Sequence, residues 1–511
     1  MLAKLQSYGL SGIEGTPITV EVDLSFGAQN VSTVGLPDNA VKESRERVRS
    51  AIQNSGYSYP EMRLLVNLAP ADIKKEGTVY DLPIALGILA AKAVYPIRNA
   101  EGYIIIGELA LDGRVRAVTG VLPMVINAYE RGFRKIMLPA ENADEASYFK
   151  DMLVYPVRDL NQAVAHLRGQ MPIEPHPQLD WSEHKTVYDH DFSEIKGQQA
   201  AKRAAEIAAA GNHNLLLVGS PGSGKTMLAR SIPSILPDLS MEESLEITRI
   251  HSVAGELKKS GVVTERPFRA PHHSASIPAL VGGGAKALPG EISLAHYGVL
   301  FMDEFPLFPP SVLEALRQPL EDGVVTVTRA SAKTTYPADF MLVAAMNPCP
   351  CGFYGSKTKE CRCTQTQIER YRNRLSGPLL DRLDIHVEMN EVNYDDLTNK
   401  SAGESSEVIR ARVAAARELQ KRRYRDEGVL FNSQLNTPLM RKYCRMTPES
   451  EELLHIAYER LKLSARAYTR VIKVARTIAD LDGSASIEKK YVLEAVQYRG
   501  LDEKYWGQGR N

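Results

Sequence analysis

The feature that most constrains the fold is a glycine-rich octapeptide between an apolar strand and a helix. Residues 219–226 read GSPGSGKT and match the GxxxxGK[ST] pattern in full. The apolar run NLLLV precedes this segment, and the helix-forming run MLARSIPSIL follows it. Glycines let the backbone wrap around phosphates, and the N-terminus of the next helix adds partial positive charge. We therefore expect an α/β fold with a site for ATP and Mg²⁺ made by Gly219, Ser220, Pro221, Gly222, Ser223, Gly224, Lys225 and Thr226. Lys225 should reach the β- and γ-phosphates, and Thr226 should bind Mg²⁺.

Two further apolar strands end in polar side chains. Val299–Met302 is followed by Asp303 and Glu304, and the run FMLVAAM is followed by Asn347. Ligands of parallel sheets bind at the carboxyl ends of the strands. We expect Asp303 to hold the Mg²⁺ shell, Glu304 to act as general base towards the attacking water, and Asn347 to orient that water. Each residue alone could simply end a strand in solvent, but the order of the three strands favours the nucleotide site.

The chain is expected to be an α/β multidomain protein. Residues 1–168 mix strands and helices, with ITVEVDLSF, LLVNLAP and YIIIGELAL as strands and a helix that ends at Gly56. Residues 169–190 hold three prolines and form the expected linker. Residues 191–395 alternate apolar strands with helices, which predicts a mostly parallel sheet. Residues 396–511 form the expected C-terminal helical lid.

Composition excludes several classes of protein. Lys plus Arg and Asp plus Glu both number 62 in 511 residues, so a basic footprint over the whole chain is absent and only a local basic surface could contact nucleic acid. The first residues lack the apolar core of a secretory signal, and no stretch approaches the ~20 apolar residues of a membrane span. Five cysteines do not make a disulfide framework. We expect a cytoplasmic protein with no membrane partner.

Several long motifs resemble one known family. GSPGSGKT, RPFRAPHHSAS, GEISLAHYGVLFMDE, AAMNPCPCG and SGPLLDRLDIHVE are similar to the magnesium-chelatase-like AAA+ family called YifB or ComM, and the resemblance covers essentially the whole chain. It implies a P-loop ATPase core followed by the helical lid of the magnesium chelatases. The segment DFSEIKGQQAAKRAA resembles the part of AAA+ proteins that packs on adenine, which implies contacts from Ile195 and Gly197.

The resemblance also implies two roles for arginines. Arg382, in LLDRLD, matches the position that points into the site of a neighbouring subunit. A guanidinium supplied in trans stabilises charge on the transferred phosphoryl group and makes hydrolysis depend on assembly. Arg466, in LSARAYTR, matches the sensor arginine of the lid, with Arg470 one turn later as the alternative. For an isolated helix arginine, a solvated surface ion pair would be the simpler interpretation.

The N-terminal region resembles a different family. Residues 102–142 are similar to the end of the proteolytic domain of Lon proteases, which implies an α+β fold of the ribosomal S5 domain 2 type. The segments that correspond to the catalytic Ser and Lys of Lon read EGTVYD and TGVLPM, and they contain neither residue type. We expect a Lon-like domain without peptidase activity that binds nucleic acid or a partner, or supports a ring.

Four of the five cysteines are clustered. Cys349, Cys351, Cys361 and Cys363 form two C-x-C pairs separated by nine residues. Four thiolates within 15 residues can close a tetrahedral Zn²⁺ site, and four reduced thiols in a loop are the alternative. His272 and His273 also suggest a metal, but adjacent histidines project differently, so a structural or subunit-contact role is expected for them.

A hairpin is expected between the Asp-Glu strand and the Asn347 strand. The run GVVTVTRASAKTTYPADF alternates and turns, with Arg329 and Lys333 near its tip. In related helicases a hairpin at this place lines the pore of the ring, so these cations are candidate contacts to DNA phosphates. An exposed hairpin with routine charges is the alternative.

The sequence and its resemblances together predict an ATP-hydrolysing homohexameric ring that moves DNA. Resemblance to this family implies a branch migration helicase that acts on branched or single-stranded DNA in recombination during natural transformation. The alternative is a magnesium-chelatase-type ATPase that drives metal insertion or remodels a protein partner. A non-enzymatic scaffold is disfavoured because Lys225, Asp303, Glu304, Asn347 and Arg382 are all present.

Overall fold

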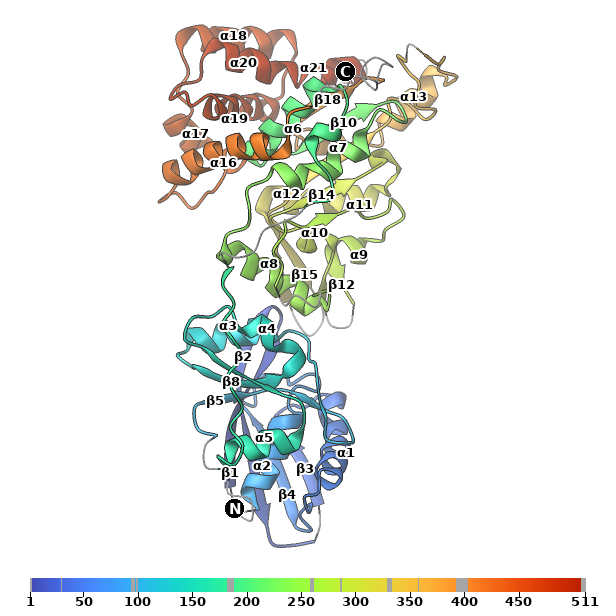
Figure 1. Ribbon diagram of the computed structural model, residues 1–511. Helices are drawn as coiled ribbons and strands as arrows, with labels where there is room; N and C mark the ends of the chain where they lie inside the picture. Colours follow the sequence, from blue (N-terminus) through green and yellow to red (C-terminus); the bar gives the residue numbers. More distant parts are fainter. Residues whose placement is uncertain are drawn as a thin grey trace. The chain divides into compact units, whose positions relative to one another are not determined.

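The chain folds into two compact units, which are described separately. The computed structural model describes residues 2–28, 30–92, 97, 100–181, 188–257, 262–284, 287–328, 333–356, 358–391 and 403–506. The first unit comprises residues 1–185 with 240–264, and the second comprises 186–239 with 265–511 (Figure 1). Residues 240–264, which lie within the range expected for the ATPase core, thus pack with the first unit. Within the described ranges, every helix is too short or too polar to cross a bilayer.

A mixed seven-stranded sheet forms the centre of the first unit. Its strand order is β3-β4-β2-β1-β5-β8-β9. β1 and β2 pair antiparallel, as do β2 and β4, whereas β5, β8 and β9 continue the sheet in parallel from β1. The strands are β1 (Leu2–Ser11), β2 (Glu14–Ser25), β3 (Asn30–Val34), β4 (Arg63–Ala69), β5 (Tyr103–Ile105), β8 (Lys135–Pro139) and β9 (Leu153–Val157). The predicted strand YIIIGELAL is two strands, because β5 pairs with β8, whereas the short strand β6 (Glu108–Leu109) pairs with β7 (Val115–Arg116).

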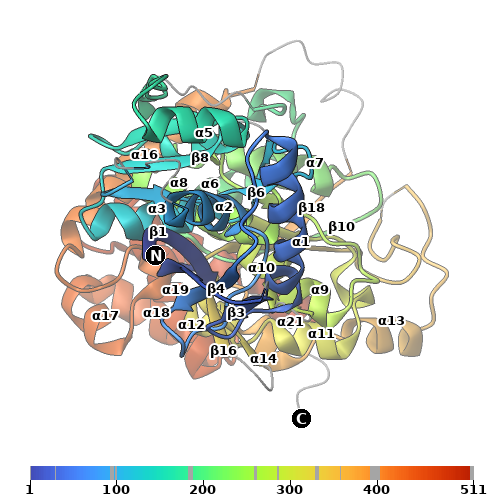
Figure 2. The ribbon, with the colours of Figure 1, turned by 90° about the horizontal axis from the view of Figure 1, so that it is seen from below.

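Helices bury their apolar faces against this sheet. α2 and α3 pack on β1 and β2. α1, which Figure 2 shows from the side, packs on α2. α1 begins at the Asp38 side chain, which accepts from the amide of Val41, and ends before Gly56, where φ is +86°. Leu245 of α8 packs against the same core. The helices are α1 (Asn39–Asn54), α2 (Asp81–Ala91), α3 (Val121–Glu130), α4 (Ala143–Ala146), α5 (Leu160–Leu167) and α8 (Met241–Ala254).

The second unit contains a five-stranded, all-parallel sheet with the order β11-β14-β17-β10-β18. β14, β17 and β10 are fully buried, which explains why their sequences are continuous apolar runs rather than alternating ones. The strands are β10 (Leu215–Gly219), β11 (Phe268–Arg269), β14 (Val299–Met302), β17 (Met341–Met346) and β18 (Ile385–Met389).

Short helices and two small hairpins complete this part of the unit. β15 and β16 pair antiparallel from Val324↔Pro337 to Thr328↔Lys333, as the alternating sequence predicts. The hairpins are β12 (Gly282–Gly283) with β13 (Leu288–Pro289), and β15 (Val324–Thr328) with β16 (Lys333–Pro337). The helices are α6 (Gln199–Gly211), α7 (Lys225–Ser231), α9 (Ile277–Val281), α10 (Glu291–Leu294), α11 (Pro310–Ala315), α12 (Pro319–Asp322), α13 (Gln365–Arg372) and α14 (Gly377–Leu380).

The C-terminal region is helical, and it shares one continuous hydrophobic core with the parallel sheet. α16 and α19 both pack on α6, orange and red against green in Figure 1. Polar contacts lie within this packing: His213 Nε2 is 2.8 Å from Thr477 Oγ1, and Gln420 donates to the carbonyl of Ala210 at 2.9 Å. The helices are α16 (Ser406–Arg423), α17 (Thr437–Tyr443), α18 (Pro448–Arg460), α19 (Ala465–Leu481), α20 (Lys489–Gln497) and α21 (Gly500–Trp506).

Candidate nucleotide site

The register of the parallel sheet brings the predicted site residues to one edge. Val218 of β10 is level with Met346 of β17, and Met302 of β14 is level with Ala344 of β17. The residues that follow these strands therefore emerge side by side at their carboxyl ends. These are the GSPGSGKT loop, the Asp303–Glu304 pair and Asn347.

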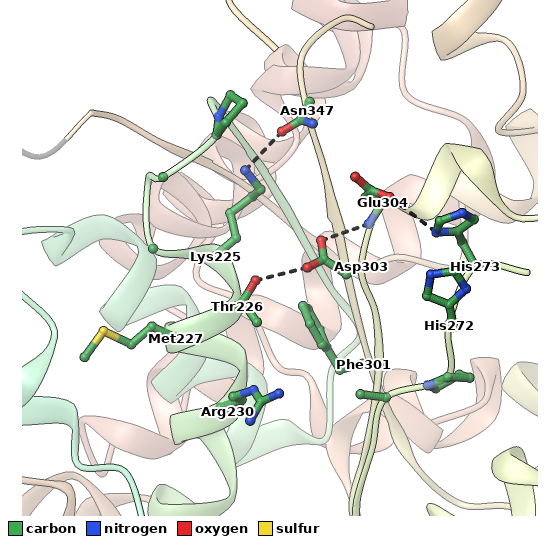
Figure 3. A pocket seen from close by; sticks show the side chains of 15 residues that line it. Lys225, Thr226, Met227, Arg230, His272, His273, Phe301, Asp303, Glu304 and Asn347 are labelled. Carbon is green, nitrogen blue, oxygen red and sulfur yellow. Dashed lines mark hydrogen bonds and ion pairs between the residues drawn. The ribbon is translucent and has the colours of Figure 1, made fainter. Parts of the chain in front are cut away.

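The glycine-rich loop holds the lysine in a defined place. Gly222 and Gly224 adopt φ of +81° and +91°, a left-handed conformation that favours glycine. Lys225 begins α7, and its Nζ donates to the carbonyls of Gly219 (2.7 Å) and Ser220 (2.9 Å). It also donates to Asn347 Oδ1 at 3.2 Å (Figure 3). Burial lowers the pKa of Lys225, and the charge of Asp303 acts in the opposite direction.

Thr226 and Asp303 lie together, as a shared magnesium site requires. Thr226 Oγ1 donates to Asp303 Oδ2 at 3.0 Å, and the amide of Glu304 donates to Asp303 Oδ1 at 2.8 Å. Hydroxyl and carboxylate oxygens are the ligands that Mg²⁺ takes beside phosphates. The residues present therefore fit Mg²⁺ bound with a nucleotide.

These side chains face a pocket of about 670 Å³. Lys225, Thr226, Asp303, Glu304 and Asn347 all line it, together with the exposed Arg230 one turn further along α7 (Figure 3). Its other lining residues are Pro221, Gly222, Gly224, Met227, Ala270, Pro271, His272, His273 and Phe301. The volume falls in the range of sites for small molecules and cofactors. A pocket with a lysine, a hydroxyl and two carboxylates at the ends of parallel strands can bind a phosphorylated ligand with its metal.

His273 contacts Glu304, the candidate base, and the sequence did not predict this contact. Its Nδ1 lies 3.3 Å from Glu304 Oε2, and Figure 3 shows both side chains on the same side of the pocket. His272 instead has its Nδ1 2.8 Å from the hydroxyl of Ser274. The histidines follow β11, which pairs in parallel with β14, so both strands run towards the edge of the sheet at which Glu304 lies. β11 is only two residues long, too short for a sequence pattern to reveal that pairing.

The segment expected to contact adenine gives a second unpredicted contact. Ile195 is buried, and Gly197 adopts a φ of +63°, but neither belongs to the set of residues that line the pocket. The next residue, Gln198, donates from Nε2 to the carbonyl of Ser223 at 3.2 Å and to that of Asn390 at 2.6 Å. Gln198 thus ties this segment to the phosphate loop.

The candidate arginines have different surroundings. Arg382 is buried, pairs with Glu321, and donates to the carbonyl of Pro378 at 2.8 Å. Arg470 is paired with Asp384, a fully buried carboxylate that also accepts from the amide of Asn214 at 2.9 Å. Arg466 is exposed on α19. Of the two candidates for the sensor role, Arg466 is therefore the one not engaged in a buried ion pair.

The four clustered cysteines converge in space. Their Sγ atoms all lie within 4.8 Å of one another, and each cysteine is a free thiol. Cys349 is fully buried, whereas the other three are half-buried.

The two predicted DNA contacts of the hairpin are only partly described. Arg329 lies outside the described residues. Lys333 is the first residue of β16, and only its backbone is described.

Comparisons with known proteins agree with this architecture. Residues 191–397 match the family described as magnesium chelatase, subunit ChlI, residues 20–142 match subunit ChlI of Mg-chelatase, and residues 403–499 match its C-terminal family. The chain is 46% identical over 494 residues to the uncharacterized protein YifB of Escherichia coli (strain K12), covering 96% of each chain. It is 43% identical over 507 residues to the competence protein ComM of Haemophilus influenzae, covering 98% of each.

A more distant similarity is confined to part of the chain. The magnesium-chelatase 67 kDa subunit of Chlorobaculum parvum is 28% identical over 162 residues, which are 31% of this chain and 23% of that protein. The near-complete coverage of the first two relatives, together with the matches along all three regions, identifies the group. The chain belongs to the magnesium-chelatase-like YifB/ComM family of ATPases.

Proposed function

We propose that this protein is an ATP-driven motor that assembles as a homohexameric ring and moves DNA during recombination. The observation that carries the proposal is the convergence of Lys225, Thr226, Asp303, Glu304 and Asn347 around one pocket. A relative named as a competence protein, 43% identical over nearly the full length, supports a role in the uptake or recombination of transforming DNA.

Each of these side chains has a role in the proposed hydrolysis. ATP with Mg²⁺, when bound, supplies the phosphoryl group to be transferred and part of the charge that stabilises it. Lys225 would leave its loop carbonyls to contact the β- and γ-phosphates, and Thr226 and Asp303 would hold the ion. Glu304 would accept the proton of the attacking water, and the Asn347 amide would orient that water.

Arg382 and the lid complete the proposed motor. Arg382 would exchange Glu321 for the phosphoryl group in the next subunit's site, and Arg466 would sense the nucleotide from α19. The antiparallel strands β15 and β16 follow β14 and precede β17 in the chain, as expected for a hairpin inserted between two core strands. Arg329 and Lys333 near the tip of this hairpin would contact DNA phosphates in the pore.

The four cysteines would hold a structural Zn²⁺.

The first test separates binding from hydrolysis. Glu304→Gln should bind ATP as the wild type does, because Lys225, Thr226 and Asp303 remain, but it should lose at least ~100-fold in turnover without the base. ATP affinity and phosphate release measured on the same preparation check this expectation. Turnover near the wild-type rate would remove Glu304 from the role of base.

The second test separates a DNA motor from a chelatase-type ATPase, which the similarity to the 67 kDa chelatase subunit favours as the alternative. Replacing Arg329 and Lys333 together with alanine should weaken DNA binding and DNA-stimulated hydrolysis, while basal hydrolysis persists. Because phosphate contacts release counterions, wild-type binding should also weaken steeply with salt. If the wild-type protein neither binds branched DNA nor responds to it, the chelatase-type function is the better account.

A further inference from the structure

The four-cysteine segment lies directly against the nucleotide site. Cys349 follows Asn347 by two residues, so the first C-x-C pair begins where strand β17 and its water-orienting candidate end. Gly352, in the same turn, is buried against Pro221 of the phosphate loop. A Cβ added to Gly352 would lie 2.5 Å from Pro221 Cδ and 3.8 Å from Asn347 Cγ.

The spacing of the sulfur atoms fits a bound metal. The Sγ of Cys349 lies 3.4 Å from that of Cys351 and 3.7 Å from that of Cys361, and Cys351 and Cys361 are 3.6 Å apart. A tetrahedron with metal–sulfur bonds of about 2.3 Å has sulfur–sulfur edges of about 3.8 Å, whereas a disulfide bond is about 2.0 Å long. With Cys363 within the same 4.8 Å group, the four thiols have the ligand type and the spacing of a closed zinc site.

The same segment is anchored on its other side. Arg372 of α13 is buried and donates from Nε to the carbonyl of Pro348 at 3.1 Å. Its guanidinium lies 4.7 Å from the ring centre of Tyr354 and 4.5 Å from that of Tyr505 on α21. In the turn itself, the amide of Gly352 donates to the carbonyl of Cys349 and the amide of Tyr354 contacts the Cys349 sulfur. Residues 348–354 are thus held between the C-terminal helices and the phosphate loop.

We infer that Zn²⁺ bound by Cys349, Cys351, Cys361 and Cys363 positions the ATPase site, by holding the turn at Gly352 against Pro221 and fixing Asn347 at the end of β17. The expected effect of zinc on turnover rests on the proposed ATPase function. The expected effect of zinc on the phosphate loop does not depend on that function. Loss of the metal releases the turn that supports both Asn347 and the loop, so ATP hydrolysis becomes zinc-dependent although none of the four cysteines lines the nucleotide pocket.

The metal is tested first, on full-length untagged protein. Wild-type protein should contain about one Zn²⁺ per chain, and protein reconstituted with Co²⁺ should show the visible absorption of a tetrahedral thiolate complex. Cys361→Ser with Cys363→Ser removes two ligands without altering residues 347–354, and this variant should lose both signals. Cys444→Ala, a buried thiol in the C-terminal region, should keep both. Wild-type protein without zinc, and with four freely reacting thiols, would overturn the inference.

The coupling is tested by hydrogen exchange and hydrolysis. In the double cysteine variant the amides of residues 219–226 should exchange about tenfold faster than in wild type, because the loop has lost its support. Turnover should fall about 10- to 100-fold, since misplacing reacting groups by about 1 Å costs that much. Unchanged exchange and turnover in zinc-free protein would refute the coupling. Faster loop exchange in a protein whose wild type does not hydrolyse ATP would support the coupling and reject the proposed function.

A pair of glycine variants tests the contact between Gly352 and Pro221 while the zinc ligands stay intact. Gly352→Ala should retain zinc but hydrolyse ATP slowly, because the new Cβ collides with Pro221. Gly355→Ala is the matched control: Gly355 has a φ of +78°, close to the +85° of Gly352, but nothing lies within 4 Å of its added Cβ. Equal turnover in the two variants would show that the Gly352–Pro221 contact does not transmit the effect of zinc.

Discussion

Glu145 in the first unit and Asp384 in the second are both buried carboxylates with different surroundings. Glu145 Oε1 accepts from Asn142 Nδ2 at 2.7 Å, and no cation lies within ion-pair distance of it in the described part of the chain. Asp384 is paired with Arg470, accepts from the amide of Asn214, and has His213 Nδ1 at 3.6 Å. Glu145 thus has a neutral amide as its side-chain hydrogen-bond partner, whereas the partners of Asp384 include a backbone amide and a guanidinium.

The pKa values shift in opposite directions as a result. Burial raises the pKa of Glu145 to about 7, and the hydrogen bonds from Asn142 and from the amide of Leu122 offset only part of that effect. Burial also acts to raise the pKa of Asp384, but Arg470 and His213 outweigh it and hold that pKa well below its ordinary range. Asp384 therefore keeps a buried charge, and this charge ties α19 to the start of β18, the strand that pairs with β10 next to the phosphate loop.

The largest effect is expected from removing Asp384 from its contacts with Arg470 and His213. Asp384→Ala leaves the partly buried Arg470 without its partner, and the free energy of unfolding of the second unit should fall by about 3–5 kcal/mol. The pKa of Asp384 in the folded state lies below the ordinary 3.8, so its contribution is complete above that pH and is lost as the pH falls through the folded pKa. Chemical denaturation at several pH values, followed by ATP hydrolysis, checks both statements.

Asp426→Ala is the control, since Asp426 is an exposed carboxylate in the same unit. If the two variants are equally stable, the Asp384–Arg470 pair does not hold the C-terminal helices to the sheet.

Replacing Glu145 in the first unit should have a smaller effect, and it should stabilise that unit rather than destabilise it. Between pH 4.5 and about 7, Glu145 holds a proton in the folded state that it releases on unfolding, so the free energy of unfolding falls as the pH rises through this range. Glu145→Gln should remove this dependence and stabilise the unit by about 1–3 kcal/mol above pH 7. Denaturation monitored by hydrogen exchange of residues 121–146 reports on this unit alone.

Glu141→Gln, at an exposed glutamate in the same turn, should leave the pH dependence as it is in wild type. A Glu145→Gln protein that still loses stability between pH 4.5 and 7 would show that another group is responsible.

The smallest effect is expected at His273, which lines the pocket rather than the core. His273→Ala should lower turnover about tenfold, near 1.4 kcal/mol, with unchanged affinity for ATP, because Glu304 loses the neighbour that orients its carboxylate. His272→Ala should have little effect, since His272 bonds to Ser274 instead. Steady-state kinetics of both variants, with nucleotide binding measured separately, decide the matter, and equal losses would mean that the two histidines act only through the shape of the loop.

The convergence of the candidate site residues was largely predictable because each of them lies in a segment that folds locally. The GSPGSGKT loop needs only a strand before it and a helix after it, and Asp303 and Asn347 each end a continuous apolar run. Parallel pairing then brings such strand ends to one edge, whatever the details of packing. The hairpin β15/β16 was predictable for the same reason, since alternation and a short turn are local properties.

Other features required the folded chain. Residues 240–264 lie between two segments of the second unit, and no local pattern indicates that they pack with the first. The same holds for His273 beside Glu304, Gln198 on the phosphate loop and Gly352 against Pro221, each a contact between segments far apart in sequence.

The sequence by itself determined the chemistry available to this protein: a phosphate loop, two carboxylates, an amide and four thiols, each in a segment that folds locally. The tertiary structure alone decided how the remaining charges are paired. Arg382 and Arg470 look alike as helix-associated arginines, but one is paired with exposed Glu321 and the other with buried Asp384. The physical reason is that the cost of separating an ion pair depends on burial and on the other groups around it, which only long-range packing creates.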